Sequence, residues 1–260
     1  MGWLPEIPPL LLFLALLVGS LVTWEGAVRL GLFSTLMPAP IQVASKLIAA
    51  LGDPFYSAGI NNAGIGLQLA ASLRRVLLGF ALAMVVALPV GFVVGMRPTL
   101  SKAVDPFVQV LRPVSPLAWL PIGLALIRDS ELAAIFVIFI SVLWPMLLNT
   151  IAATNPVPRT YLEVARTLRA GRWRTIRRVI LPAALPDILT GLRVSMGIAW
   201  LVIIAAEMLI GGRSIGYFIW NQWNNLDIAS VFVGILLVGT VGLGLDKIFR
   251  LLERRWRYDG

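Results

Sequence analysis

Six stretches of about 20 mostly apolar residues, separated by polar segments, dominate this chain of 260 residues. A helix needs about 20 such residues to cross the hydrocarbon core of a bilayer. The pattern therefore predicts an all-α integral membrane protein with about six transmembrane helices. The expected spans are residues 9–28, 76–96, 107–127, 132–153, 188–210 and 228–249.

The first stretch has the length of a signal peptide's apolar region, but its flanks favour a retained helix. No Lys or Arg precedes it, and no small-x-small cleavage motif follows closely. The segment 29–75 then lies outside, with a short interfacial helix that begins at Pro40 and carries Ile41, Ile48 and Leu51 on its apolar face. We expect two parts: residues 1–64, and a core of five spans at 65–260.

Positive charge is distributed unevenly between the two sides of the predicted topology. The chain carries 22 Lys and Arg against 13 Asp and Glu, a net charge of +9. If the N-terminus is inside, the inner segments hold 14 basic residues and the outer segments hold 6. Since inner loops are enriched in Lys and Arg, both termini are predicted to be cytoplasmic. No soluble module carries a basic patch, which argues against a nucleic-acid partner.

Composition removes most catalytic chemistry from this chain. Hydrophobic residues make up 58% and charged residues 13%, with no His and no Cys. The commonest general base, the commonest metal ligand and all thiolate sites are therefore missing. An intramembrane protease would need an Asp pair, but Asp105, Asp187 and Asp246 lie near span ends without a paired motif. We expect no catalytic residue, metal or cofactor in this chain.

The polar segment 156–186 is the most informative stretch between the spans. Apolar residues recur there at helical spacing, seven Arg occupy many other positions, and Gly171 interrupts the pattern. This predicts two short helices across the membrane face with a turn at Gly171. One interpretation is a basic amphipathic hairpin on anionic lipid headgroups, and the other is a docking element for a cytoplasmic protein.

Glu163-Val164-Ala165, then Gly171, then Val179-Ile180-Leu181-Pro182 resemble the EAA loop of ABC importer permeases. The sequence departs from that pattern at Val164 and at Arg169, which stands where the family has Gly. The resemblance covers roughly residues 65–260 and implies a type I importer permease fold. It also implies an ATP-binding subunit docked at each EAA loop. The residues expected to couple to it are Glu163, Ala165, Arg166, Gly171, Arg172 and Trp173.

The resemblance also implies the partners of this chain. These are a second copy in a homodimer, two cytoplasmic ATP-binding subunits, an extracytoplasmic substrate-binding protein and membrane lipid. The sequence contains no Gly-x-x-x-x-Gly-Lys-Ser/Thr motif. ATP and Mg²⁺ are therefore expected on the partner subunits, and the localisation expected is the bacterial cytoplasmic (inner) membrane.

Polar residues inside the spans are candidates for a translocation pathway, because they are costly there. Two sets each share one helical face by spacing, and a third set shares a face loosely. The candidates are Arg112, Ser115 and Trp119; Arg193, Trp200 and Glu207; and Trp144 with Asn149. Arginine and indole donors in an apolar wall suit a small anion with delocalised charge.

Each candidate has a structural alternative. Arg193 could snorkel to the cytoplasmic interface, Arg112 could pair between subunits, and Glu207 could form a structural ion pair rather than a gate. The tryptophans could pack or form an interfacial belt. Gly91 and Gly95 form a Gly-x-x-x-Gly pair, which is a weak signal of helix packing.

Two further segments resemble one branch of the permease family. The run from Leu111 to Pro121 is similar to the nitrate, sulfonate and taurine branch, and the run from Ala199 to Trp220 is most similar to nitrate, bicarbonate and cyanate permeases. We expect nitrate or nitrite first, bicarbonate or cyanate next, and sulfonate or taurine after them. A secondary transporter is the other alternative, but its usual inverted repeats are not evident.

Overall fold

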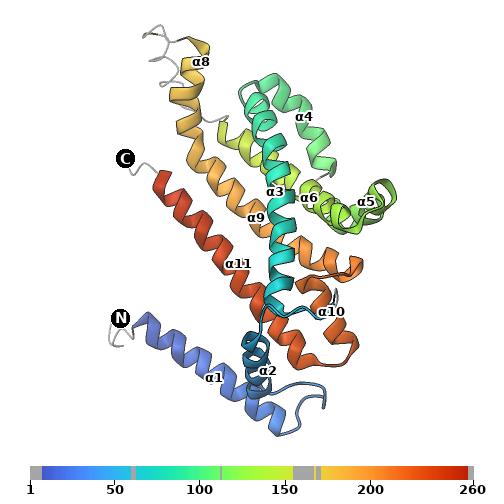
Figure 1. Cartoon of the computed structure of the whole chain (residues 1–260). Helices are drawn as coiled ribbons and strands as arrows, with labels where there is room; N and C mark the ends of the chain where they lie inside the picture. The colour runs from blue at the N-terminus through green and yellow to red at the C-terminus, as the bar shows by residue number, and fades with distance from the viewer. Residues whose placement is uncertain (1–7, 60–62, 112, 155–166, 168–170, 257–260) are drawn as a thin grey trace.

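The computed structural model describes residues 8–59, 63–111, 113–154, 167 and 171–256, and it is helical throughout these ranges apart from loops and one isolated bridge between Ser57 and Ala63 (Figure 1). The elements are α1 Pro9–Arg29, α2 Pro40–Gly52, α3 Ile65–Gly95, α4 Pro98–Leu111, η1 Pro116–Trp119, α5 Leu120–Ile127, α6 Ser130–Thr154, α8 Arg172–Thr175, η2 Ile176–Ile180, α9 Leu181–Ile210, α10 Ile215–Asn224 and α11 Ile228–Trp256.

Five of these helices are long and apolar enough to cross a membrane, and they contain five of the six predicted spans. They are α1, α3, α6, the continuous helix Trp173–Ile210 and α11. Helix α3 begins at Ile65, eleven residues before the predicted span, because the segment that precedes the span is already helical. The prediction of an all-α membrane protein is confirmed.

The third predicted span is not one straight helix. Helix α4 ends at Leu111, and the pair formed by η1 and α5 leaves it at an angle of 87°. Pro113 and Pro116 explain the break, since proline lacks an N–H and disfavours helical backbone in the residue before it. The prolines of the predicted span at 107–127 thus mark a real interruption, and a sixth span exists only if the bent pair is counted as one.

The segment after Gly171 also differs from the prediction. Instead of a separate short helix, residues Trp173–Ile210 form one continuous helix of 38 residues. A π-helical turn, η2, lies just before Pro182, and the Leu181 N–H there donates to the Ile176 carbonyl. The wider turn keeps the chain helical where proline withholds a donor. The other half of the predicted hairpin lies outside the described residues.

The core forms where α3 packs along α6, α6 packs along α9, and α11 flanks α9 (Figure 1). Glycines on α3 permit the close approach to α6. A Cβ on Gly79 would lie 2.7 Å from Ile138 Cβ, and a Cβ on Gly91 would lie 2.7 Å from Thr150 Cβ. A Cβ on Gly95 would overlap the Thr154 hydroxyl. The packing role suggested by the Gly91–Gly95 spacing is thus confirmed.

Helices α1 and α2 lie at the periphery. Trp24 of α1 contacts Phe232 of α11 with ring centroids 5.1 Å apart, but most of α1 stands away from the other helices (Figure 1). The predicted short helix at Pro40 is confirmed as α2, and its apolar residues Ile41 and Ile48 are exposed rather than buried in the chain. The start of α1 and the end of α11 point to the same side (Figure 1).

Candidate functional site

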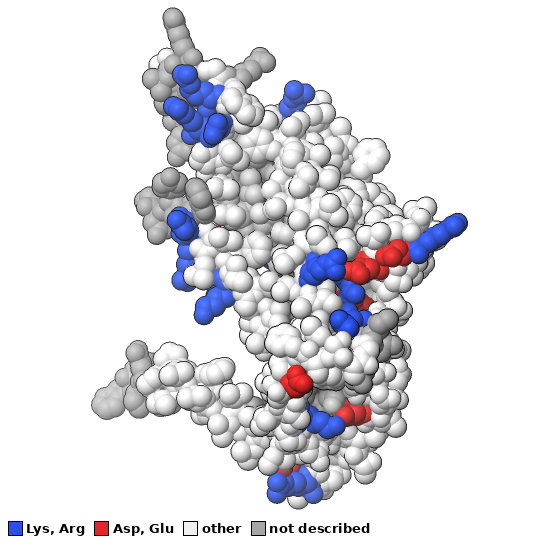
Figure 2. All heavy atoms as spheres, in the orientation of Figure 1, with Lys and Arg blue, Asp and Glu red and all other residues white. Residues whose placement is uncertain are grey.

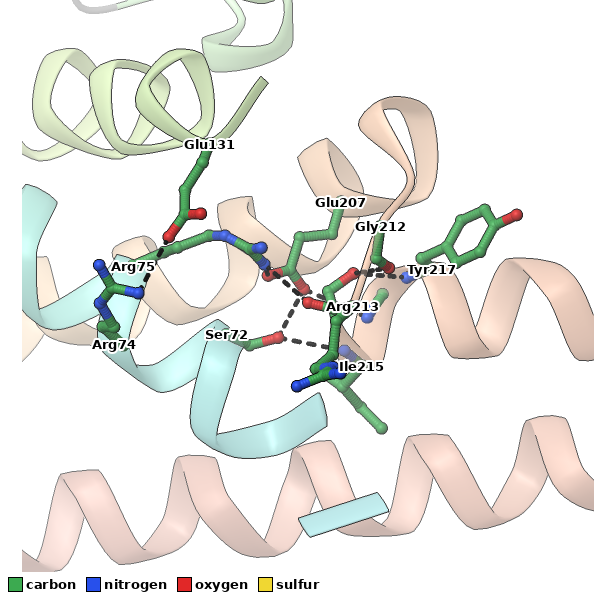
Figure 3. A network of polar contacts seen from close by, with 11 residues as sticks. Ser72, Arg74, Arg75, Glu131, Glu207, Gly212, Arg213, Ile215 and Tyr217 are labelled. Carbon is green, nitrogen blue, oxygen red and sulfur yellow. Dashed lines mark hydrogen bonds and ion pairs between the residues drawn. The ribbon is translucent and has the colours of Figure 1, made fainter. Parts of the chain in front are cut away.

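A buried carboxylate joins α9, α3 and the start of α10. Glu207 is 1% exposed. Its Oε1 accepts from Arg75 Nη1 at 2.8 Å, and its Oε2 accepts from the Ser72 hydroxyl at 2.7 Å and from the Gly216 N–H at 3.2 Å (Figure 3). Ser72 Oγ in turn accepts from the Ile215 N–H at 3.1 Å. We call these five residues the Glu207 network.

The Glu207 network holds the first turn of α10 against α9. The first N–H groups of a helix have no intrahelical acceptor, and a carboxylate there is favourable. Ser214 caps the same helix by accepting from the Tyr217 N–H at 3.2 Å. Gly216 is required at the contact, because a Cβ there would overlap the Ile204 carbonyl and lie 2.7 Å from Glu207 Cβ. Of the two roles considered for Glu207, the ion pair is the one observed.

A hollow of about 670 Å³ opens beside this network. Its charged lining comes from the ends of α3, α5, α6 and α9, and Figure 2 shows basic and acidic groups gathered together near mid-height. Arg74 Nη1 lies 3.3 Å from Glu131 Oε1 across it. We call it the arginine hollow, and its charged residues are Arg74, Arg75, Arg128, Asp129, Glu131, Glu207 and Arg213.

The predicted face of α9 is occupied by contacts within the chain. Arg193 Nε donates to Asp246 Oδ1 at 2.6 Å, and its Nη1 donates to Glu253 Oε2 at 3.3 Å. The Trp200 indole N–H donates to the Val238 carbonyl at 3.0 Å. Arg193 and Trp200 thus both face α11, whereas Glu207 binds α3 and α10. Arg193 is held by an ion pair rather than extended freely to the interface.

Two other pathway candidates lie on α6. The indole nitrogen of Trp144 is buried and has no acceptor among the described residues. Asn149 packs so closely on Gly191 of α9 that a Cβ on this glycine would lie 2.5 Å from Asn149 Cβ. Asn149 also lines a hollow of about 320 Å³ together with Asp187. The two side chains therefore lie at different parts of the α6 surface.

The candidates around the predicted third span are separated by its break. Ser115 is the N-cap residue of η1, and Trp119 ends it, so neither continues the helix that stops at Leu111. Arg112 lies outside the described residues. The expectation that these three share one helical face is therefore wrong for Ser115 and Trp119, because the break precedes them.

Half of the predicted coupling residues fall where the structure gives no description. Glu163, Ala165 and Arg166 lie outside the described residues. Gly171 is exposed, and Arg172 begins α8. Trp173 is 74% exposed, and Figure 2 shows a cluster of basic side chains around this end of the molecule. The described basic residues beside it are Arg174, Arg177 and Arg178.

Sequence reasoning missed Ser72, Arg75 and the helix α10. Arg75 was visible only as an outer charge, and its partner Glu207 is 132 positions away. No local spacing connects such positions. The available signal was a charged residue inside a predicted span, which needs a partner of opposite charge. Among the described residues, no group of Asp and Glu could hold a metal ion.

Comparisons with known proteins identify the chain's relatives. The family described as "Binding-protein-dependent transport system inner membrane component" matches residues 83–258. The nitrate import permease NrtB of Synechocystis sp. is 43% identical over 84% of this chain and 79% of its own length. The bicarbonate transport permease CmpB of Synechococcus elongatus is 38% identical over 97% of this chain and 91% of its own length.

A more distant relative and a solved structure also match the chain, and the structural match confirms the predicted fold of an ABC importer permease. The taurine transport permease TauC of Escherichia coli is 33% identical over 90% of this chain and 84% of its own length. Among solved structures, the MetNI methionine ABC transporter in an inward-facing conformation aligns with a TM-score of 0.65 at 16% identity. That alignment covers 73% of this chain and 94% of the matched chain. At this identity the structural match supports the fold alone.

Proposed function

We propose that this chain, which belongs to the family of inner membrane components of binding-protein-dependent transport systems, imports a small inorganic anion, nitrate or nitrite first. One observation carries the proposal, namely the 43% identity to a nitrate import permease over 84% of this chain. The arginine hollow, with its surplus of positive charge, is consistent with an anionic substrate.

The relatives leave two other anion classes as candidates for the substrate. The bicarbonate permease is 38% identical over a larger share of this chain, and the taurine permease is 33% identical. Bicarbonate resembles nitrate in size, planarity and single charge, whereas taurine adds an ammonium group. Nitrate is the first candidate substrate because the nitrate permease has the higher sequence identity to this chain. Cyanate is ranked together with bicarbonate as the second candidate.

The transporter we propose is a homodimer of this chain with two ATP-binding subunits and an extracytoplasmic binding protein. Both termini are cytoplasmic, and the chain lies in the inner membrane. Residues 156–186 receive the ATP-binding subunits, with exposed Trp173 and the arginines of α8 and η2 at the contact. ATP and Mg²⁺ bind to those partners, which perform the hydrolysis. Arginines at such a rim form charge-assisted hydrogen bonds with carboxylates.

The path for the anion is proposed to follow the break between α4 and η1, where Arg112, Ser115 and Trp119 lie close in sequence. Irregular backbone at membrane depth is tolerated where it lines a cavity. Trp144 and Asn149 of α6 are retained as pathway candidates. The Trp144 indole N–H has no acceptor among the described residues, and Asn149 lines a hollow. Arg193, Trp200 and Glu207 are proposed to support the path by fixing α9 to its neighbours.

Reconstitution tests the proposed assembly. The complete complex in proteoliposomes should take up nitrate only when ATP is supplied, and the ATP-binding subunits should co-purify with this chain. Glu163→Lys should uncouple hydrolysis from uptake, because Glu163 matches the docking motif. Coupled uptake by this variant would refute the docking assignment, and uptake without ATP would identify a secondary carrier instead.

A further inference from the structure

The arginine hollow carries more positive charge than its own carboxylates neutralise. Four arginines and three carboxylates line it. Arg75 is paired with Glu207, and Arg74 is paired with Glu131. Of the remaining groups, the Asp129 carboxylate accepts from the Leu132 N–H at 2.8 Å, where it caps α6. Two guanidiniums, those of Arg128 and Arg213, therefore remain against one carboxylate that is already engaged.

Arg128 stands at a position where the backbone favours glycine. It follows the last residue of α5 with φ +57°, in the left-handed region, and its N–H donates to the Leu124 carbonyl at 3.0 Å. Left-handed backbone costs a residue with a Cβ about 1–2 kcal/mol, and glycine is the usual occupant of this cap. Within the described part of the chain, the Arg128 side chain has neither an ion pair nor a hydrogen bond.

Arg75 is the most deeply buried of the arginines that line the hollow. The Arg75 side chain is 11% exposed, and its Nε is buried without a hydrogen-bond partner among the described residues. Gly211 and Gly212 line the hollow and contribute no side chains to fill it. Arg213 donates to Ser57 Oγ at 3.2 Å through one nitrogen, and its guanidinium offers further N–H groups. The hollow thus combines surplus positive charge, the free donors of Arg128 and Arg213, and open space.

We propose that the arginine hollow is a binding site for a small planar oxyanion such as nitrate, held by Arg128 and Arg213 beside Arg75. Guanidinium forks match planar oxyanions through paired hydrogen bonds. In the orientation proposed above, the site lies on the extracytoplasmic side of the membrane, where it receives the anion before translocation. This assignment rests on the proposed function. A recess with a buried arginine at its inner end suits a small ion better than a protein surface.

The test measures anion binding directly, without transport. The permease complex in nanodiscs is first given chloride, which broadens the ³⁵Cl resonance where it binds. Nitrate is then added, and the nitrate concentration that reverses the broadening gives its apparent affinity. Arg128→Gly removes the charge while it relieves the backbone, so the fold should persist. We expect the apparent affinity for nitrate to fall about fivefold, as the loss of one solvent-exposed charge contact implies. Arg213→Gln should give a loss of similar size.

Two matched variants control for backbone and for charge. Leu226→Gly relieves a second non-glycine residue with positive φ, at +59°, that does not line the hollow, and Arg255→Gln removes an exposed arginine of α11. Both should bind nitrate as the unmodified complex does. Unchanged nitrate affinity in Arg128→Gly would overturn the proposal. Unchanged affinity with impaired stimulation by the binding protein would also overturn it, and would assign the hollow to protein docking.

The outcome separates this site from the proposed function. If the hollow binds nitrate but the reconstituted transporter does not import it, the site stands and the proposed substrate fails. If the transporter imports nitrate, and the Arg128→Gly variant binds and imports nitrate as the unmodified complex does, the proposed function stands and the site fails.

Discussion

Glu207 of α9 and Arg75 of α3 form a buried ion pair, with Glu207 Oε1 2.8 Å from Arg75 Nη1 and both side chains at most 11% exposed. The neighbouring residue, Arg74, forms an exposed pair with Glu131 on α6. Two consecutive arginines therefore form the same kind of ion pair in two environments, one buried in the protein and one exposed at the surface. The first pair joins α3 to α9 inside the Glu207 network, whereas the second bridges the rim of the arginine hollow.

Removing one partner of each pair should have unequal consequences. Glu207→Gln leaves a guanidinium buried without a counter-ion, which costs about 3–5 kcal/mol of unfolding free energy. Glu131→Gln breaks an exposed pair, which costs at most about 1 kcal/mol. Tryptophan fluorescence during unfolding of the detergent-solubilised chain measures both values. Equal losses would show that the buried network does not hold α10 in place.

A methyl group at Gly91 should separate α3 from α6. Gly91→Ala places a Cβ 2.7 Å from Thr150 Cβ. Overpacking of this kind costs about 1–3 kcal/mol. Gly244→Ala on α11 is the control, because a Cβ there meets nothing within 4 Å, and it should gain up to about 1 kcal/mol from helix propensity. The same unfolding assay applies, and a loss from Gly244→Ala exceeding that from Gly91→Ala would contradict the packing.

Arg193 and Asp246 should show energetic coupling in a double-mutant cycle. Arg193→Gln and Asp246→Asn each break the contact of 2.6 Å between α9 and α11. Both side chains are about one-third exposed, so the coupling free energy should be only about 0.5–1 kcal/mol. A direct pathway role for Arg193 predicts something else, namely that Arg193→Gln abolishes uptake while Asp246→Asn leaves it intact.

The contact between Lys46 and Asp227 should make stability depend on pH in the acid range. Partial burial acts to raise the pKa of the Asp227 carboxyl, but Lys46 at 2.6 Å and hydrogen bonds from Ser230 outweigh it and hold this pKa below its usual value. The stabilisation is therefore complete above the unfolded pKa of about 3.9 and is lost as pH falls through the lower folded pKa.

Thermal melting of the chain and of Asp227→Asn from neutral to acid pH measures this contribution. The difference in melting temperature should stay constant above about pH 5 and shrink below it. A difference that grows toward acid pH would reverse the assigned sign. Glu25→Gln, which breaks an exposed pair within α1, is the control and should show a smaller difference throughout.

The spans could be predicted because each is a local property of about 20 apolar residues. The break after Leu111 was visible in its prolines, but its angle of 87° depends on packing that no local pattern specifies. Continuity through Pro182 was missed because a π turn before it compensates for the lost donor. A proline considered alone predicts that a helix ends there, and it does not predict the π-helical turn that lets this helix continue.

The site was predicted less completely than the fold. Glu207 and Arg193 stood out because charges inside spans need partners, but periodicity placed them on one face and could not name those partners. Asp246 lies 53 positions from Arg193, and Ser72 lies 135 positions from Glu207. The arginine hollow joins the ends of α3, α5, α6 and α9, so its composition follows only from the tertiary arrangement.

Uptake of ¹⁵N-nitrate into proteoliposomes that contain the complete complex tests the central claim most directly. The account predicts uptake that requires both ATP and the binding protein, is competed strongly by nitrite, and is competed weakly by bicarbonate and taurine. ATP-dependent uptake of taurine that nitrate leaves unaffected would contradict it.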